Sequence, residues 1–281
     1  MARLERQGAQ VFAVARRQPV GSIVSGRLFQ ADLAQSADAE RVFSVSRPEI
    51  VFHMASQVLG ARDIRHVSTT LQANLVAAVN ILTCATESGC ERVVMAGSME
   101  EPVDHDCPPI PSSPYAAAKW AATGYARMFH ALYQTPVVMA RIFMVYGPGQ
   151  KDLKKLIPYV ITSLLQGDHP QVSAGTRPVD WIYIDDVVAG LLRCGATPGI
   201  CGERFDLGTG VTETVRGVVE ALGRIIEAED SISFGAVPDR AMETVRVAQT
   251  GGKNSRLGWQ ANLSLDEGLR RTVEWYRTRS A

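Results

Sequence analysis

The chain has 281 residues, enough to bury a large core in one large domain or two modest ones. Lysine plus arginine and aspartate plus glutamate total 29 each, so the charge balance excludes a simple electrostatic binder of nucleic acid. The longest apolar runs are strand-length and the first residues do not resemble a signal peptide, which predicts a soluble, cytoplasmic protein without a membrane partner.

Short β-branched runs alternate with helical patterns, which predicts an α/β fold with a parallel sheet covered by helices on both faces. Strands are expected at residues 11–15, 27–30, 50–53, 92–96 and 137–141. Helices are expected at residues 38–46, 71–87, 114–133, 156–166, 186–194, 214–227 and 265–279. Ligands of such sheets bind beyond the carboxyl ends of the strands, where Ser98 and His53 are expected.

The cysteines show no spacing typical of a zinc site, and their number is odd. We interpret them as reduced packing residues and expect neither a metal nor a disulfide. They are Cys84, Cys90, Cys107, Cys194 and Cys201.

The motif Tyr115-Ala-Ala-Ala-Lys119 places a phenol and an ammonium four residues apart, on one face of a helix. A nearby cation stabilises a phenolate and lowers the tyrosine pKa, which makes Tyr115 a candidate acid and base. Ser98 would polarise the same substrate oxygen, and Lys119 would also reach a cofactor ribose. Ser113 and Pro114 suit the first positions of this helix. An isolated pair of this kind is more often part of an ordinary amphipathic helix, but the surrounding motifs favour catalysis.

Those motifs resemble the extended short-chain dehydrogenase/reductase family, the NAD(P)-dependent sugar-nucleotide epimerases and dehydratases. The matching segments are 50–56, 74–80, 97–98, 113–119, 141–150, 180–187, 205–210, 257–259 and 265–269, in the family's order. The resemblance implies a Rossmann-like, doubly wound parallel sheet at residues 1–150. It also implies a smaller substrate lobe at 151–281, from which 180–207 returns to the main sheet. Relatives commonly form homodimers through the helices at 71–87 and 114–133.

The resemblance also implies a set of site residues. Catalytic roles fall to Ser98, Tyr115 and Lys119. Cofactor contacts are expected at Arg16, Asp32, Leu33, His53, Ala55, Asn74, Tyr115, Lys119 and Ile142. Substrate contacts are expected at Glu100, Met144 and Arg177. Asp32 is alternatively a helix N-cap, and Asp185 and Asp186 are interpreted as capping residues.

A dinucleotide fold needs a first strand, in the middle of the sheet, followed by a Gly-rich turn that holds the pyrophosphate, and we expect both to be missing from this chain. Residues 2–10 are typical of the end of the helix that follows such a turn, with Gly8 as its C-cap. We expect either a start codon assigned too late, which we favour, or a protein that has lost cofactor binding. As given, the chain is expected to bind cofactor poorly.

The second family strand ends at Ala15, where NAD-preferring relatives carry an acidic residue. Arg16 and Arg17 follow, and an arginine can clamp a phosphate bidentately. NADP is therefore favoured slightly over NAD, although a solvated arginine pair is nearly as good an interpretation.

Three departures from the family pattern bear on the reaction. Sugar 4,6-dehydratases carry Asp-Glu where this chain has Met99-Glu100, and a thioether cannot protonate a leaving hydroxyl, although Glu100 or Glu101 remains a possible base. The family's epimerases carry a phosphate-binding arginine at the position of Val179. Arg177, on the same strand face, is a possible substitute. Before the Val-Tyr-Gly-Pro turn the family usually carries an asparagine, and this chain has Met144 there, which removes a polar substrate contact.

The leading hypothesis is an NAD(P)-dependent oxidoreductase or epimerase acting on a nucleotide-linked sugar. A ketone reductase acting on a non-nucleotide substrate is an alternative favoured by Val179 and Met144. The third possibility is a cofactor-free scaffold or regulatory pseudoenzyme. The motifs do not name the sugar.

Overall fold

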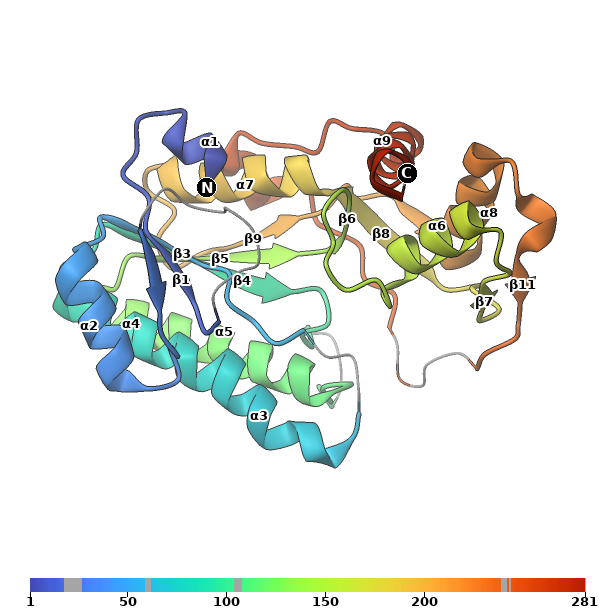
Figure 1. Ribbon diagram of the computed structural model, residues 1–281. Helices are drawn as coiled ribbons and strands as arrows, with labels where there is room; N and C mark the ends of the chain where they lie inside the picture. The colour runs from blue at the N-terminus through green and yellow to red at the C-terminus, as the bar shows by residue number, and fades with distance from the viewer. Residues whose placement is uncertain (18–26, 59–61, 104–107, 239–241, 243, 281) are drawn as a thin grey trace. The chain divides into compact units, whose positions relative to one another are not determined.

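The computed structural model describes residues 1–17, 27–58, 62–103, 108–238, 242 and 244–280. Its strands are β1 (Ala13–Ala15), β2 (Leu28–Gln30), β3 (Ile50–His53), β4 (Arg92–Ser98), β5 (Val137–Ile142), β6 (Met144–Tyr146), β7 (Gln171–Val172), β8 (Pro178–Tyr183), β9 (Arg204–Leu207), β10 (Thr212–Thr214) and β11 (Ser233–Phe234). Its α-helices are α1 (Ala2–Glu5), α2 (Ser36–Ser46), α3 (Val67–Leu71), α4 (Ala77–Glu87), α5 (Pro114–Tyr133), α6 (Leu156–Gln166), α7 (Ile184–Ala196), α8 (Val215–Ile226) and α9 (Leu265–Ser280) (Figure 1).

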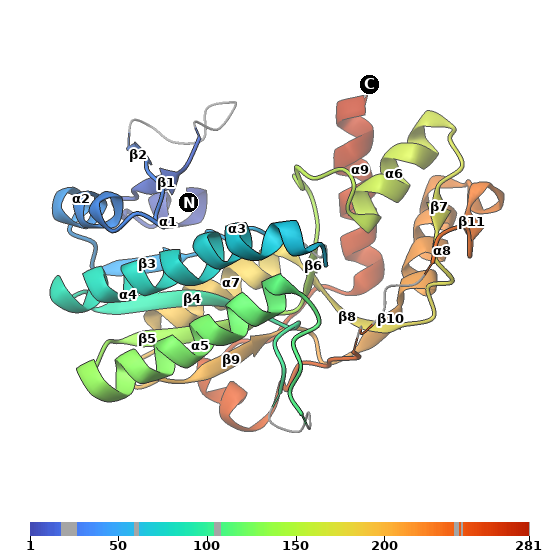
Figure 2. The ribbon, with the colours of Figure 1, turned by 90° about the horizontal axis from the view of Figure 1, so that it is seen from below.

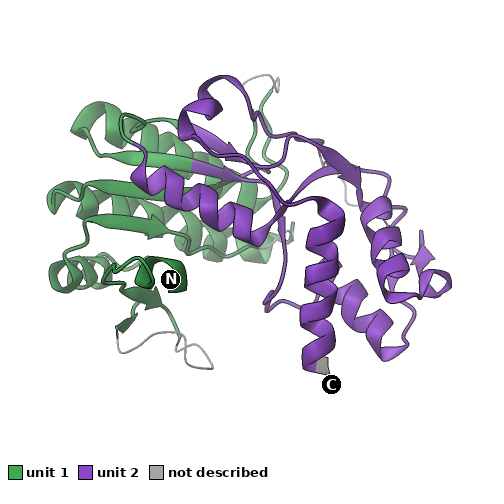
Figure 3. Cartoon of the chain, turned by 90° about the horizontal axis from the view of Figure 1, so that it is seen from above, with its two compact units in different colours: residues 1–97, 101–139, 198–203 green, residues 98–100, 140–197, 204–281 purple. Residues whose placement is uncertain are grey.

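The described residues divide into two compact units (Figure 3). The first comprises residues 1–97, 101–139 and 198–203, and the second comprises 98–100, 140–197 and 204–281. The predicted boundary at residue 150 stays a prediction. The carboxyl ends of β4 and β5 are assigned to the second unit, whereas the rest of both strands is assigned to the first.

The main sheet has the strand order β3-β4-β5-β9, and β3 and β4 run parallel with Ile50 opposite Arg92. A second parallel ladder joins β1 and β2, with Ala13 opposite Leu28. Within the described residues these two ladders share no hydrogen-bonded strand. The predicted Rossmann-like fold with parallel strands is confirmed.

The core of the first unit lies between its strands and the helices α2, α4 and α5. Figure 2 shows α4 and α5 side by side along β3, β4 and β5, and α2 packs against α4. Small and aliphatic side chains from all three helices meet strand residues such as Val93 and Met95 in one apolar cluster. This burial provides the main driving force for the unit to fold.

The helices that the sequence predicts are present, with small differences at their ends. The helix expected at 71–87 differs most, because a π-helical turn, Gln72–Val76, separates α3 from α4. The continuous helical stretch Ile64–Glu87 is long and apolar enough to cross a membrane by length and composition alone. Side chains along its α4 half belong to the core cluster, so we interpret it as a core helix.

In the second unit β8 lies between β6, which runs parallel to it, and β10, which runs antiparallel. Helix α8 packs against both α6 and α9. Of the predicted free thiols, Cys84, Cys90 and Cys194 are buried, whereas Cys107 lies outside the described residues. The predicted C-cap of the first helix was wrong by two positions: Arg6 is the cap, and Gly8 follows with φ of 83°.

Candidate active site

The start of α5 has the cap that the sequence predicts. The Ala116 amide donates to Ser113 Oγ over 3.1 Å, and Pro114 occupies the first turn. This fixed start sets the rotation of the helix, so Tyr115 and Lys119 share one face. Both side chains are buried, and Lys119 Nζ lies 6.0 Å from the centre of the Tyr115 ring.

Lys119 is held against β4 in a nearly dry environment. Its Nζ donates to the Ala96 carbonyl over 2.9 Å, and only 4% of the residue is exposed. Burial lowers the Lys119 pKa from 10.5 to about 8, and the carboxylate of Glu101 opposes that shift. Burial also lowers the pKa of His53, at the end of β3, to about 3, with a further lowering by Lys119. The imidazole is therefore neutral near pH 7.

Ser98 ends β4 and is buried. Its Oγ accepts from the Glu100 amide over 3.2 Å, and the Met99 amide donates to the Ile142 carbonyl over 3.0 Å. Alternation along the strand puts the Ser98 side chain on the same face as that of Ala96, whose carbonyl binds Lys119. Residues 98–100 belong to the second unit and Tyr115 belongs to the first, so contact between Ser98 and Tyr115 stays a prediction.

Asn74 fixes the loop that follows β3. Its Oδ1 accepts from Ser56 Oγ and from the Gln57 amide, both over 2.8 Å. Its Nδ2 donates to the Gln57 carbonyl over 3.1 Å. Asn74 is buried in the π-helical turn, whereas Ala55 is exposed beside the loop it holds. Asn74, predicted from the sequence as a cofactor contact, thus holds the loop next to His53 in place.

The remaining predicted cofactor residues of this unit follow β1 and β2. Arg16 is exposed just after β1. Asp32 Oδ1 accepts from the Ala34 amide over 3.1 Å, which is a turn bond three residues before the actual N-cap of α2, Gln35. The alternative of Asp32 as an N-cap was therefore wrong. Leu33 is buried in the core cluster.

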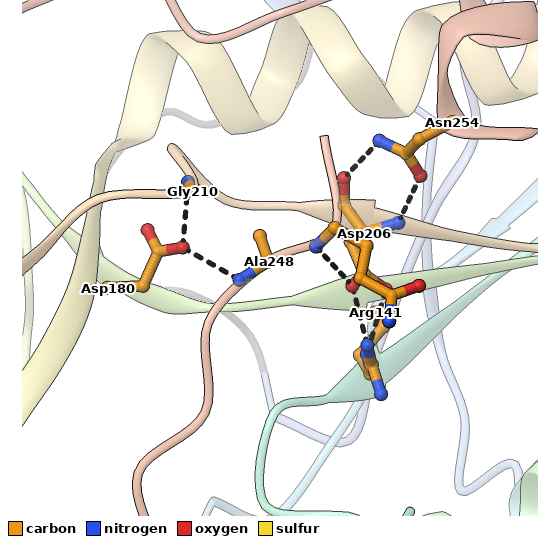
Figure 4. A network of polar contacts seen from close by, with 7 residues as sticks. Arg141, Asp180, Asp206, Gly210, Ala248 and Asn254 are labelled. Atoms are coloured by element: carbon orange, nitrogen blue, oxygen red, sulfur yellow. Dashed lines mark hydrogen bonds and ion pairs between the residues drawn. The ribbon is translucent and has the colours of Figure 1, made fainter. Parts of the chain in front are cut away.

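In the second unit Asp180 organises a loop of the motif at 205–210. Its carboxylate accepts from the amides of Gly210 and Ala248 over 2.9 and 3.0 Å (Figure 4). It also accepts from the Thr209 amide over 2.8 Å. Gly210 has φ of 78°, and a Cβ on Gly208 would lie 2.9 Å from Asp180 Oδ2. This turn therefore requires glycine.

Sequence reasoning missed a buried ion pair next to this loop. Arg141, on β5, donates through Nε and Nη2 to the two carboxylate oxygens of Asp206, on β9, and both residues are buried (Figure 4). Asn254 bonds the backbone amide and carbonyl of Asp206 over 2.8 and 3.0 Å. The available signal was one arginine in the otherwise apolar strand β5 and one aspartate between Phe205 and Leu207 in β9.

Two of the predicted substrate residues of this unit, Met144 and Arg177, lie at the ends of strands. Met144 begins β6 and Arg177 immediately precedes β8; both are partly buried, and the Val215 amide donates to the Arg177 carbonyl over 3.1 Å. Asp186, interpreted from the sequence as a capping residue, does not cap α7 with its side chain. Its Oδ2 accepts instead from the amides of Asn262 and Leu263 over 3.2 and 3.0 Å.

Among the described residues, no three histidine, cysteine, aspartate or glutamate side chains gather as metal ligands would. Known proteins give a clear match: the model of the NAD-dependent epimerase/dehydratase family aligns with residues 1–208. The chain belongs to this family.

Individual members of the epimerase/dehydratase family resemble the chain over most of its length. The UDP-glucose 4-epimerase of Mycolicibacterium smegmatis is 29% identical over 262 residues, which cover 89% of this chain and 83% of that protein. The dTDP-glucose 4,6-dehydratase DesIV of Streptomyces venezuelae, crystallised with NAD, is 30% identical, with a TM-score of 0.79 and coverage of 90% and 80%. The UDP-glucose 4-epimerase of Thermotoga maritima has a TM-score of 0.89 at 24% identity, covering 100% and 94%.

These matches establish an enzyme family of NAD-dependent, sugar-nucleotide epimerases and dehydratases, as the motifs indicated. Both reaction types occur among the relatives, so membership alone does not choose between them.

Proposed function

We propose that this protein is an NAD(P)-dependent oxidoreductase or epimerase that acts on a nucleotide-linked sugar, with Tyr115 as the acid and base. The observation that supports it most is the buried Tyr115–Lys119 pair, in which Nζ lies 6.0 Å from the phenol ring centre and is anchored on the Ala96 carbonyl. A buried lysine beside a tyrosine favours the phenolate, which is the form that accepts a proton from a sugar hydroxyl.

The first unit carries side chains suited to contact a dinucleotide cofactor, although its sequence has no Gly-rich turn to hold the pyrophosphate. Arg16 and Asp32 follow β1 and β2, and His53 is the last residue of β3, at the carboxyl ends where parallel sheets bind ligands. Asn74 fixes the loop after β3 by three hydrogen bonds, so this part of the edge is preorganised. The nicotinamide supplies hydride acceptance and donation when the cofactor is bound. In this proposal Arg16 binds the adenosine ribose phosphate, Asp32 contacts the adenine and Lys119 binds a ribose.

The protein's own residues would then move one proton. Tyr115 takes the hydroxyl proton as the ring carbon is oxidised and returns it on reduction, while Ser98 orients the same oxygen. Lys119 stays protonated at neutral pH, because its pKa is about 8, and stabilises the negative phenolate oxygen. His53 is uncharged at this pH and adds no competing cation.

The same site disfavours dehydration. Elimination of water needs an acid next to the leaving hydroxyl, and the family's aspartate is Met99 here, which is buried. Oxidation, reduction or epimerisation at a carbinol carbon needs only Ser98, Tyr115, Lys119 and the nicotinamide.

For the cofactor we propose NADP ahead of NAD. Arg16 is exposed directly after β1, and Ala15 leaves no carboxylate there to repel a ribose phosphate. The solved relative named above holds NAD, which keeps NAD as the alternative.

The experiment that tests the proposed function is incubation of the protein with NAD or NADP and either UDP-glucose or dTDP-glucose. NMR of the sugar product should show an epimer or a keto sugar that keeps all its carbon atoms and has lost no hydroxyl group as water. A 6-deoxy-4-keto product would mean dehydration. No product from either nucleotide sugar, with turnover of a simple ketone, would favour the ketone reductase.

A further inference from the structure

Glu101 is a carboxylate removed from solvent next to the proposed catalytic helix. Its exposed fraction is 0%, and its Oε2 accepts from Thr123 Oγ1 over 2.7 Å. Glutamate is rarely buried completely unless a hydrogen bond or an opposite charge compensates the lost hydration. A fully buried Glu101 therefore requires a partner of opposite charge or a strong donor nearby.

The position of Thr123 points to that partner. Thr123 lies four residues after Lys119 on α5, so the two side chains share a helix face. The bond from Thr123 therefore draws the Glu101 carboxylate onto the face that carries Lys119. Lys119 is also buried and has its Nζ anchored on the Ala96 carbonyl over 2.9 Å.

The charges around Lys119 come from three elements. Glu101, in the segment after β4, raises the Lys119 pKa, whereas burial lowers it to about 8. His53, on β3, is neutral near pH 7 because burial lowers its pKa to about 3. Tyr115, on α5 itself, is the residue whose phenolate the Lys119 ammonium would stabilise. Glu101 is thus the charge that offsets the burial of Lys119.

We propose that Glu101, oriented by Thr123, is a positioning residue that holds the Lys119 ammonium charged and in place beside Tyr115. This inference rests on the proposed function for its catalytic meaning, but the Glu101–Lys119 coupling itself is independent of any substrate. It also assigns Glu101 a role other than the substrate base that its place after Ser98 suggests.

The first test uses stability and needs no activity. Unfolding free energy is measured by urea titration between pH 7 and 10.5 for the wild type and for Glu101→Gln, which keeps the shape but removes the charge. We expect the pH at which Lys119 loses its proton in the folded protein to fall by about 1 unit. The same replacement made in a Lys119→Met protein should leave the alkaline part of the curve unchanged. An unchanged curve for Glu101→Gln alone would overturn the proposal.

The second test uses the pH profile of turnover with NADP or NAD and UDP-glucose or dTDP-glucose. In Glu101→Gln the alkaline limb should move to lower pH by about 1 unit, because Lys119 deprotonates earlier. Glu91→Gln, which removes an exposed glutamate just before β4, is the matched control and should keep the wild-type limb. A lower turnover at every pH with an unshifted limb would mean a structural role only.

A conservative variant keeps the proposal testable if Glu101→Gln does not fold. Glu101→Asp retains the charge one methylene farther from Lys119 and should shift both curves in the same direction by a smaller amount. Shifted stability curves without turnover of either nucleotide sugar would support the coupling and reject the proposed function. If neither the stability curve nor the pH profile of turnover shifts, the coupling is rejected.

Discussion

Lys119 is a charged side chain held almost entirely out of water, and this position costs folding free energy. Burial lowers its pKa from 10.5 in the unfolded chain to about 8. Between these values the unfolded chain binds more protons, so the unfolding free energy rises as the pH increases from about 8 to 10.5. Below pH 8 both states are protonated and the full penalty remains, roughly 3 kcal/mol for a shift of this size.

We predict that the double replacement of Lys119→Met with Glu101→Gln stabilises the protein relative to the wild type near pH 7 by up to about 3 kcal/mol, because two neutral side chains fill the space without a buried charge. The gain should shrink as the pH rises through the window from about 8 to 10.5, since the wild type loses its charge there. Urea unfolding of both proteins across this window measures it. A stability difference that stays constant with pH would show that the lysine charge is not the cause.

Cofactor choice is a second question at the residue scale. If Arg16 binds the ribose phosphate, Arg16→Ala should weaken NADPH binding by about 10-fold or more and leave NADH binding nearly unchanged, since one charge-assisted contact is lost. Arg17→Ala is the matched control, because Arg17 is exposed next to it. Calorimetric titration with both cofactors decides. Equal affinities for NADPH and NADH in the wild type would reject the idea.

The spacing of Tyr115 and Lys119 was predictable because a helix face is a local property. The partners of Glu101 and Arg141 were not, since they lie 22 and 65 residues away in sequence. A buried charge signals that a partner exists, but only the fold identifies which residue it is.

At the scale of elements, the ends of α5 were predictable and the break in the helix before α4 was not. Ser113 and Pro114 define the start of α5 through contacts within four residues. The π-helical turn at Gln72–Val76 instead carries Asn74, whose bonds reach residues 17 and 18 positions earlier. Such turns recur at functional sites, and no local pattern announces this one.

We predict that Asn74→Ala destabilises the protein by about 2 to 3 kcal/mol, because Ser56 and Gln57 lose three hydrogen bonds to a buried side chain. Cofactor affinity should fall as well, since the loop after β3 is released. Asn80→Ala, which removes one bond to the Leu33 carbonyl, is the comparison and should cost about 1 kcal/mol. Urea unfolding and cofactor titration measure both effects. Unchanged cofactor affinity in a destabilised Asn74→Ala protein would confine Asn74 to stability.

At the scale of the whole molecule, alternating strand and helix patterns predicted the parallel α/β architecture because burial on two faces leaves a clear signal in sequence. Among the described strands, β1-β2 and β3-β4-β5-β9 form separate ladders, which agrees with the expectation from the sequence that the first strand is missing. The patterns did not foresee the linked carboxylates of Asp180 and Asp206, whose bonds join β8 and β9 to residues 248 and 249 in the second unit.

The central claim is that Tyr115 moves the proton while the sugar carbon is oxidised or reduced. The measurement is single-turnover kinetics of the wild type and Tyr115→Phe, mixed with cofactor and the nucleotide sugar that the wild type converts, together with cofactor titration of both. We predict that turnover falls by about 100-fold or more while cofactor affinity changes little, because only the phenolic oxygen is removed. Turnover in Tyr115→Phe close to the wild-type rate would contradict the account.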